Sequence, residues 1–351
     1  MESSGTYGDV LRHALAEKGL AVLQVAPKRT HDAAEVFDGV PSLHDVKAAT
    51  VIGRLHFDGA SHPWPLNDLQ RRTWRAEVDT LALFEGQLQR CLNRLEGLLA
   101  RHWPELPAIL ALTSVTLIQL LWAFGSPRRV AEQRSRAEAL MRRVGGPQLA
   151  AEKIADVLNS AEATIGVPCL EAERVHLQVV AGQAVHFRKC AKGVQQRLEA
   201  RCEKDPATQG LAAAIGRKSA AVLFALLGAP RSYPNAGSYL KALGLNLTER
   251  SSGKKKGALR LAKRGSGTAR RYLYLAALRL IARERSVKRW YEAKVARDGG
   301  VRIKAVVAIM RKLAKGLWQV GQGAVFDPNR LFNAELVSAS RHQGALTDMK
   351  P

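Results

Sequence analysis

The sequence predicts a mainly α-helical protein that opens with a small α/β segment, continues into a long helical arm, and ends in a strongly basic helical domain. Three observations predict this fold class. Residues 5–26 read as a helix followed by a strand, residues 66–103 carry leucines at heptad-like spacing, and residues 236–345 combine helical spacing with glycine-rich joints. A chain of 351 residues has room for two or three domains, at roughly 150 residues per domain.

The first 65 residues show the α/β pattern. Helical spacing is followed by the apolar residues Val10, Leu11, Ala14 and Leu15, and Gly19 ends that helix. Residues 21–27 form a short β-rich run closed by a proline. A second helix is expected over residues 45–55, and residues 59–65 read as a loop. We therefore assign residues 1–65 to the opening α/β domain.

A long helix over residues 66–103 forms the arm, which we assign to residues 66–104. Its apolar positions recur among arginine, glutamine and glutamate, and prolines at 104 and 107 end it. Such a helix is typical of one arm of a helical hairpin, or of a coiled coil that packs or dimerises. The apolar stripe consists of Leu81, Leu88, Leu92, Leu95 and Leu99.

Residues 105–205 are expected to form a helical region with a break at 166–168. The most apolar stretch of the chain, residues 108–125, approaches the length of a membrane span. Polar residues interrupt it, so we expect a core helix and no membrane association. The interrupting residues are Thr113, Ser114, Thr116 and Gln119.

A weak internal repeat relates residues 115–129 to residues 218–232. Each copy is an apolar helix followed by a glycine, a small residue, a proline and an arginine. Glycine and proline end a helix and turn the chain, and the arginine after the turn can reach a phosphate. Two units that grip a DNA backbone are one interpretation, and two similar helix ends that arose by chance are the other.

The charge of the chain points to a polyanionic partner. Lys and Arg total 54 against 31 Asp and Glu, which gives a net charge of +23 and a pI of about 10.4. Residues 250–320 alone contain 21 basic and 3 acidic residues, a net charge of +18. Such an excess repels itself unless a polyanion is bound, with nucleic acid the first candidate and an anionic membrane surface the second. We place it in a C-terminal domain over residues 206–325, followed by a polar tail over 326–351.

The candidate nucleic-acid contacts lie where a helix ends at Gly244, a loop of serines and lysines follows, and a glycine-rich turn leads into a basic helix. Backbone N–H groups of such a turn can hold a phosphate. The candidate binding side chains are Lys254, Lys255, Lys256, Lys263, Arg264, Arg270 and Arg271.

Two serines of this loop, Ser251 and Ser252, are candidate nucleophiles. Fixed positive charge lowers the cost of forming an alkoxide and stabilises a phosphorane-like transition state. The alternative is a solvated basic loop whose serines only donate hydrogen bonds to phosphate.

The four cysteines do not form a CxxC pair, and no histidine pair has zinc-finger spacing. His186 and Cys190 are four residues apart on one expected helix face, which is the one pairing that could share a metal. Glu2 and Asp9 stand where a signal peptide would be basic, so we expect free thiols in a reducing cytoplasm.

Four segments in order resemble the transposases of insertion-sequence family 110. In chain order, these are the first 29 residues with the HDVKAA segment at 44–49, the segment SYLKALGL at 238–245, the Ser-Gly-basic loop after it, and the Lys-Arg-Gly pattern that starts at residue 263. The helix over 66–103 occupies the position of that family's coiled-coil insertion. The resemblance covers nearly the whole chain and is weakest over 130–205.

The resemblance implies a ribonuclease-H-like domain with four metal-binding carboxylates, a serine domain that joins covalently to DNA, a structured guide RNA, and a dimer or tetramer. The family's carboxylates would hold Mg²⁺, which activates the attacking oxygen and steadies the leaving one. The motif glutamate falls on Glu2, the first aspartate of the Asp-x-x-Asp motif on Asp45, and the serine before glycine on Ser252, with Ser251 beside it.

The chain also departs from the family pattern. Ala48 stands where the second aspartate is expected, and the family's first strand lies upstream of the glutamate that here follows Met1. We therefore expect an N-terminally truncated, partial ribonuclease-H-like domain. The resulting hypotheses are an active transposase-recombinase, a catalytically inactive nucleic-acid-binding remnant of one, or a coiled-coil structural protein. A solvated Glu2 that binds no metal remains an alternative for that residue.

Overall fold

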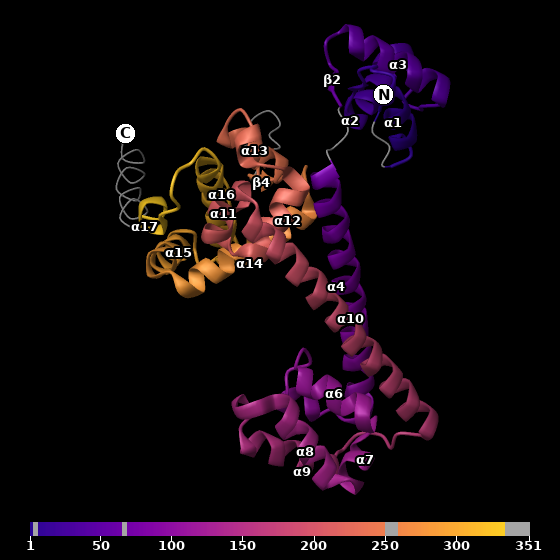
Figure 1. The fold of residues 1–351 in the computed structure, drawn as a ribbon, viewed down its shortest axis with the longest axis vertical. Helices are drawn as coiled ribbons and strands as arrows, with labels where there is room; N and C mark the ends of the chain where they lie inside the picture. Colours follow the sequence, from indigo (N-terminus) through magenta and orange to yellow (C-terminus); the bar gives the residue numbers. More distant parts are fainter. Residues whose placement is uncertain (3–5, 65–68, 250–258, 334–351) are drawn as a thin grey trace, which may run out of the picture. The chain divides into compact units, whose positions relative to one another are not determined.

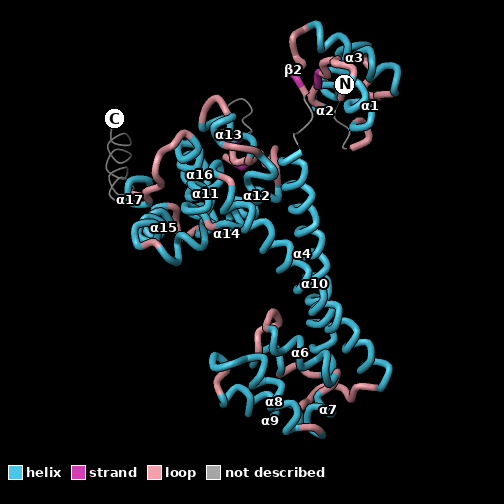
Figure 2. The backbone as a smooth tube through the Cα atoms, in the orientation of Figure 1, coloured by secondary structure: helices cyan, strands magenta, loops and turns pink. Residues whose placement is uncertain are grey.

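The structure is a computed structural model that describes residues 1–2, 6–64, 69–249 and 259–333. The chain divides into two compact units, Met1–Arg72 and Thr73–Pro351. Helices dominate both units, and the strands of the described residues form two sheets of two short strands each (Figures 1 and 2). The mainly α-helical fold class is therefore confirmed.

The first unit contains three helices and one small sheet. In chain order these are α1 (Asp9–Glu17), β1 (Leu23–Gln24), α2 (Pro27–Asp38), α3 (Asp45–Phe57) and β2 (His62–Pro63). The two strands pair antiparallel, with Leu23 opposite Pro63 and Gln24 opposite His62. Residues 59–65, expected to be a loop, thus contribute a strand, and the strand expected over 21–27 is only two residues long.

Helix α2 was not predicted from the sequence, because Pro27 was interpreted as the end of a strand. In the structure Pro27 is also the first residue of the helix. Proline is favoured at that position because the first-turn N–H has no intrahelical partner and the proline φ angle is already helical. The helix ends at Gly39, whose φ of 74° is in the left-handed region.

A buried lysine, Lys47, joins α3 to the end of α2. The Lys47 side chain is 4% exposed, and its ammonium donates hydrogen bonds to Asp38 Oδ1 at 2.6 Å and to the Val40 carbonyl at 2.5 Å. The hydrogen bond from Lys47 holds the pKa of the Asp38 carboxyl below its usual value. The interaction connects the start of α3 to the chain that leaves α2.

The second unit is built on two long helices, α4 (Leu69–His102) and α10 (Glu171–Lys204), which run antiparallel (Figure 1). Arg201 Nε lies 2.9 Å from a Glu77 carboxylate oxygen, while Arg101, at the other end of α4, lies 3.3 Å from Glu173. Contacts near the start of one helix therefore fall near the end of the other. The arm predicted over 66–103 is α4, and it forms a helical hairpin within its own chain.

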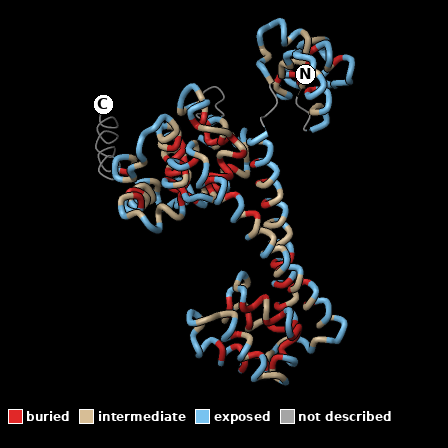
Figure 3. The backbone as a smooth tube through the Cα atoms, in the orientation of Figure 1, coloured by how far each residue is buried: buried red, intermediate tan, exposed pale blue. Residues whose placement is uncertain are grey.

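One end of this hairpin packs into a first cluster, here called the middle core. It contains α5 (Leu106–Ile109), α6 (Val115–Phe124), α7 (Pro127–Glu132), α8 (Arg134–Gly145), a 3-10 turn (Gly146–Gln148) and α9 (Ala151–Glu162). Figure 3 shows that its buried residues gather inside this cluster and that the outer faces are exposed. The apolar stretch 108–125 is divided between α5 and α6, as expected for core helices, and no helix in the described part of the chain is long and apolar enough to cross a membrane.

The other end packs into a second cluster, the C-terminal core. It contains α11 (Pro206–Ile215), α12 (Arg217–Leu227), a 3-10 turn (Pro230–Ser232), α13 (Ala236–Ala242), β3 (Leu247–Thr248), β4 (Arg260–Leu261), α14 (Gly267–Arg283), α15 (Arg285–Arg297), α16 (Arg302–Gly321) and α17 (Pro328–Leu331). Phe332, in the segment predicted as a tail, is 1% exposed and its ring lies 5.8 Å from that of Trp290.

The two copies of the weak repeat lie in different cores. Each is an apolar helix that ends at a glycine with positive φ, Gly125 at 71° and Gly228 at 78°. The chain then continues into a helix in the first copy and into a 3-10 turn in the second. The shared feature is the way the helix ends, since only glycine adopts these φ values without strain.

We expect Leu95→Ala to destabilise the protein by about 2–5 kcal/mol, because Leu95 is fully buried in the middle core and the substitution leaves a cavity. Leu83→Ala is the matched control on the same helix, since Leu83 is 57% exposed, and should change stability by less than about 0.5 kcal/mol. Urea denaturation followed by circular dichroism measures both. Equal losses in the two variants would contradict the assignment of Leu95 to this core.

Candidate nucleic-acid interface

A two-stranded sheet holds the base of the segment that carries the candidate serines. Strands β3 and β4 pair antiparallel, with Leu247 opposite Leu261 and Thr248 opposite Arg260. The Ala262 N–H also donates to the Asn246 carbonyl at 2.7 Å. The chain between the strands therefore leaves and returns at neighbouring points of the C-terminal core.

Residues 250–258 lie outside the described residues. Five predicted site residues fall in this segment, and the structure gives no position for them. They are Ser251, Ser252, Lys254, Lys255 and Lys256.

The glycine-rich turn after β4 packs tightly against the end of α13. A Cβ on Gly265 would lie 2.3 Å from the Ala242 carbonyl oxygen, so the turn tolerates no side chain there. Lys263 adopts a φ of 54°, which is uncommon for a residue with a Cβ. The turn leads into α14, where the Ser266 hydroxyl caps the helix by accepting a hydrogen bond from the Ala269 N–H at 3.1 Å. The predicted turn before a basic helix is thus present.

Arg270, one of the predicted nucleic-acid contacts, organises this turn. A single guanidinium nitrogen lies 3.3 Å from each of three carbonyl oxygens, those of Leu243, Lys263 and Gly265. These carbonyls come from the end of α13 and from both sides of the turn. Arg270 therefore joins two segments that would otherwise meet only through backbone contacts.

Arg271 lies in a different environment. Its side chain is 62% exposed and lies 3.6 Å from the Glu85 carboxylate of α4. Glu85 also accepts hydrogen bonds from Lys218 at 2.8 Å and from the Tyr272 hydroxyl at 3.1 Å. Burial and the neighbouring Glu85 carboxylate raise the pKa of Tyr272, so the phenol remains protonated. Lys263 and Arg264, in contrast, are exposed on the turn itself.

A groove of about 700 Å³ lies beside the base of the serine segment. Leu247, Leu259 and Leu261 line one side of it, at or next to the paired strands, and residues of α15 and α16 line the other. Its basic residues are Lys294, Lys304, Arg311, Lys312 and Lys315.

The charges of this groove differ in how far they are neutralised. Lys294 pairs with Asp298, and although burial opposes ionisation, hydrogen bonds from Lys294 and Arg297 keep the pKa of Asp298 low. Burial and the neighbouring Lys315 lower the pKa of Lys312, whose ammonium lies 5.5 Å from the centre of the Trp290 ring. Lys304 and Lys315 are exposed. The groove thus presents an excess of positive charge over apolar walls, which suits a sugar-phosphate backbone.

The groove residues of α16 were not predicted from the sequence. Lys304, Arg311 and Lys315 are spaced by seven and four residues, so they share one face of a helix. That spacing was visible in the sequence, but the strands that complete the groove were not.

Glu2 and Asp45 lie in the first unit. Glu2 forms an isolated parallel bridge with Val25, and Asp45 is an exposed residue in the first turn of α3. Among the described residues, only His102, Cys169 and Glu173 form a group of three or more potential metal donors within 4.8 Å of one another. Among the described residues, neither Glu2 nor Asp45 has two other potential metal donors close to it. The described residues therefore do not fit the family's metal-binding set.

Comparison with known proteins shows which sequences this chain is similar to. Residues 212–292 match the model of the transposase IS116/IS110/IS902 family. The chain is also 24% identical over 265 residues to the "Insertion element IS110 uncharacterized 43.6 kDa protein" of Streptomyces coelicolor. That alignment covers 73% of this chain and 65% of the relative, so the matched part spans less than two thirds of the relative's length. The predicted resemblance to insertion-sequence family 110 is confirmed.

We expect Arg270→Ala to destabilise the C-terminal core by about 1–3 kcal/mol, because three carbonyl oxygens lose a charged donor. The control Arg271→Ala removes the next arginine, whose exposed pairing with Glu85 is worth less than about 1 kcal/mol. Chemical denaturation of both variants measures the difference. If Arg271→Ala proved the more damaging, the structural role assigned to Arg270 would be wrong.

Proposed function

Since residues 212–292 carry the domain of the IS116/IS110/IS902 transposases, we propose that this chain is a transposase of an insertion sequence that cleaves and rejoins DNA through Ser252. The observation that supports the proposal is that three independent features lie in the same part of the protein. The family match, the paired strands at the base of the serine segment and the basic groove beside them all fall in the C-terminal core.

The proposed reaction is a nucleophilic substitution at phosphorus. The Ser252 hydroxyl loses its proton and attacks a DNA phosphodiester, so that a serine–phosphorus bond forms and one phosphorus–oxygen bond of the DNA breaks. The departing DNA oxygen takes up a proton and becomes a hydroxyl. A hydroxyl of the partner DNA end then attacks the same phosphorus, which restores the free serine and rejoins the strand.

The basic side chains have separate roles in this proposal. Lys254, Lys255 and Lys256 flank the nucleophile and stabilise charge on the phosphate oxygens. Lys263 and Arg264 bind the backbone from the exposed turn, and the groove of α16 holds the strand further along. Arg270 acts indirectly, since its hydrogen bonds fix the turn that presents Lys263 and Arg264.

Further partners follow from the family resemblance. We propose DNA as the substrate, a structured guide RNA as cofactor-like partner, a homodimer or tetramer as the working form, and the bacterial nucleoid region of the cytoplasm as its place of action. The family implies Mg²⁺ bound by carboxylates such as Glu2 and Asp45. The described residues around these two do not complete such a site, so no step above is assigned to a metal.

A covalent adduct tests the catalytic proposal. Purified protein is incubated with the element's flanking RNA, Mg²⁺ and labelled target DNA, and then resolved on a denaturing gel beside Ser252→Ala and Ser251→Ala. We expect a protein–DNA adduct in the wild type and in Ser251→Ala, and none in Ser252→Ala.

The absence of an adduct in the wild type, with salt-sensitive DNA binding retained, would favour the alternative of a catalytically inactive nucleic-acid-binding remnant. One departure from the family supports that alternative, namely Ala48 in place of the second motif aspartate. An adduct lost only in Ser251→Ala would move the nucleophile by one residue.

The groove is tested by the salt dependence of DNA binding. Replacing Lys304 and Lys315 with glutamine should weaken binding and reduce the slope of log K against log salt by about 2, at roughly 0.9 per lost phosphate contact. Lys153→Gln, an exposed lysine of α9 in the middle core, is the control. An unchanged slope in the double variant would exclude the groove from the DNA path.

A further inference from the structure

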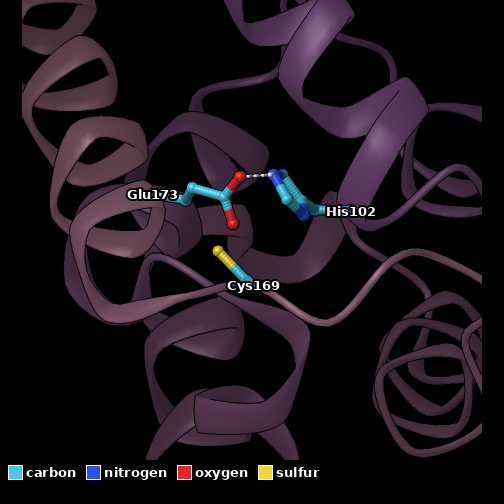
Figure 4. A group of neighbouring side chains, drawn as sticks. All are labelled: His102, Cys169 and Glu173. Atoms are coloured by element: carbon cyan, nitrogen blue, oxygen red, sulfur yellow. Dashed lines mark ion pairs between the residues drawn. The ribbon is translucent and has the colours of Figure 1, made fainter.

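Three potential metal ligands meet where the hairpin helices join the loop between α9 and α10. His102 is at the end of α4, Cys169 is in the loop, and Glu173 is in the first turn of α10. Figure 4 shows the three side chains turned toward one another. Their donor atoms all lie within 4.8 Å of one another. This group could not be predicted from the sequence, because His102 and Cys169 are 67 positions apart.

The histidine is oriented as a ligand. His102 is 1% exposed, and its Nδ1 lies 2.9 Å from the Val167 carbonyl oxygen. A carbonyl oxygen can only accept, so Nδ1 donates to it, and Nε2 is the ring nitrogen left to bind a metal ion. Nε2 faces Glu173 Oε1 at 3.7 Å, which is longer than a hydrogen bond. A nitrogen and an oxygen bound to one tetrahedral zinc ion lie about 3.3 Å apart, so the observed separation needs little adjustment.

The carboxylate is oriented in the same way. Glu173 Oε2 accepts a hydrogen bond from the Leu170 N–H at 2.9 Å, which leaves Oε1 directed at His102. Arg101 also lies 3.3 Å from Oε1, but its side chain is 59% exposed and free to turn toward solvent. Backbone contacts that fix ligand orientation are characteristic of metal sites in proteins.

The loop that carries Cys169 is held firmly against α4. A Cβ on Gly166 would lie 2.2 Å from the His102 carbonyl oxygen, and the Val167 N–H donates to the Arg101 carbonyl at 2.9 Å. The Glu105 carboxylate accepts hydrogen bonds from the Ile165 N–H at 2.9 Å and from the Thr164 hydroxyl at 2.8 Å. The cysteine is therefore presented by a backbone that is already ordered, which lowers the entropy cost of binding.

We propose that His102, Cys169 and Glu173 bind a zinc ion, with water as the fourth ligand, and that the ion fastens this loop to both hairpin helices. Thiolate, imidazole and carboxylate together favour zinc over Mg²⁺ or Ca²⁺, which prefer oxygen ligands alone. Binding releases the Cys169 thiol proton to solvent and leaves the oxidation state of the metal unchanged. The site is separate from the proposed serine chemistry and does not depend on it.

The test is a zinc titration of the full chain, stripped of metal and with any affinity tag removed, in competition with a chromogenic chelator. We expect one high-affinity Zn²⁺ per chain, and a melting temperature that rises with added zinc because the ion binds the folded state. Glu173→Gln keeps the hydrogen bond to Leu170 but loses the carboxylate charge, and should weaken binding more than about 10-fold. Substitution of Co²⁺ should give a thiolate charge-transfer band that is absent in Cys169→Ala.

The chain provides its own matched control. Cys190 Sγ lies 3.5 Å from His186 Nε2 on α10, so Cys190→Ala removes a second cysteine that also has a histidine neighbour. Zinc affinity and the cobalt band should be unchanged in Cys190→Ala. The proposal is overturned if the wild type binds no zinc, if Cys169→Ala and Glu173→Gln bind it as the wild type does, or if only Cys190→Ala loses it. Circular dichroism shows whether each variant is folded. If Cys169→Ala does not fold, the zinc affinity of Glu173→Gln decides the test.

Discussion

The antiparallel pairing of α4 with α10 is the constraint on which the second unit depends. Each helix contributes to both cores: Trp74, Val78 and Leu81 of α4 are buried in the C-terminal core, while Leu92, Leu95 and Leu99 are buried in the middle core. The partner helix does the same in reverse order. Neither core is complete without both helices, so the two cores share structural elements although they share few other contacts. Each Å² of apolar surface buried along this seam contributes about 25 cal/mol to its stability.

Positive charge in the C-terminal core is divided between structure and recognition. Arg270 and Arg311 donate to backbone carbonyls, Arg311 to that of Leu245 at 2.6 Å, and they hold the chain on either side of the serine segment. Lys263, Arg264, Lys304 and Lys315 remain exposed. The formal charge of a segment therefore overstates the number of side chains that can neutralise phosphate, because an arginine bound to carbonyl oxygens is committed to the fold.

Parts of this organisation could be predicted from the sequence, and others could not. The α4 stripe and the break near Gly166 were predicted correctly, because helical periodicity and helix-ending residues are local signals. Helix α2 was missed because Pro27 is compatible both with the end of a strand and with the first turn of a helix. The partner of α4 could not be predicted, since periodicity shows that a face is buried but not which residues cover it. The same limit hid the groove and the His102–Cys169–Glu173 group, which both join segments distant in sequence.

The sheet at the base of the serine segment has a consequence for how this region can vary. Thr248 and Arg260 are cross-strand neighbours, so the two ends of the 11-residue stretch between them are held close together. The entropy cost of closing a loop grows only with the logarithm of its length, and doubling this one would cost only about 0.6 kcal/mol. A shift of one residue within β3 or β4 is far more severe, because it would turn Leu247 or Leu261 to the opposite face of the sheet and away from the groove. Insertions and deletions should therefore accumulate between these strands and be excluded from them.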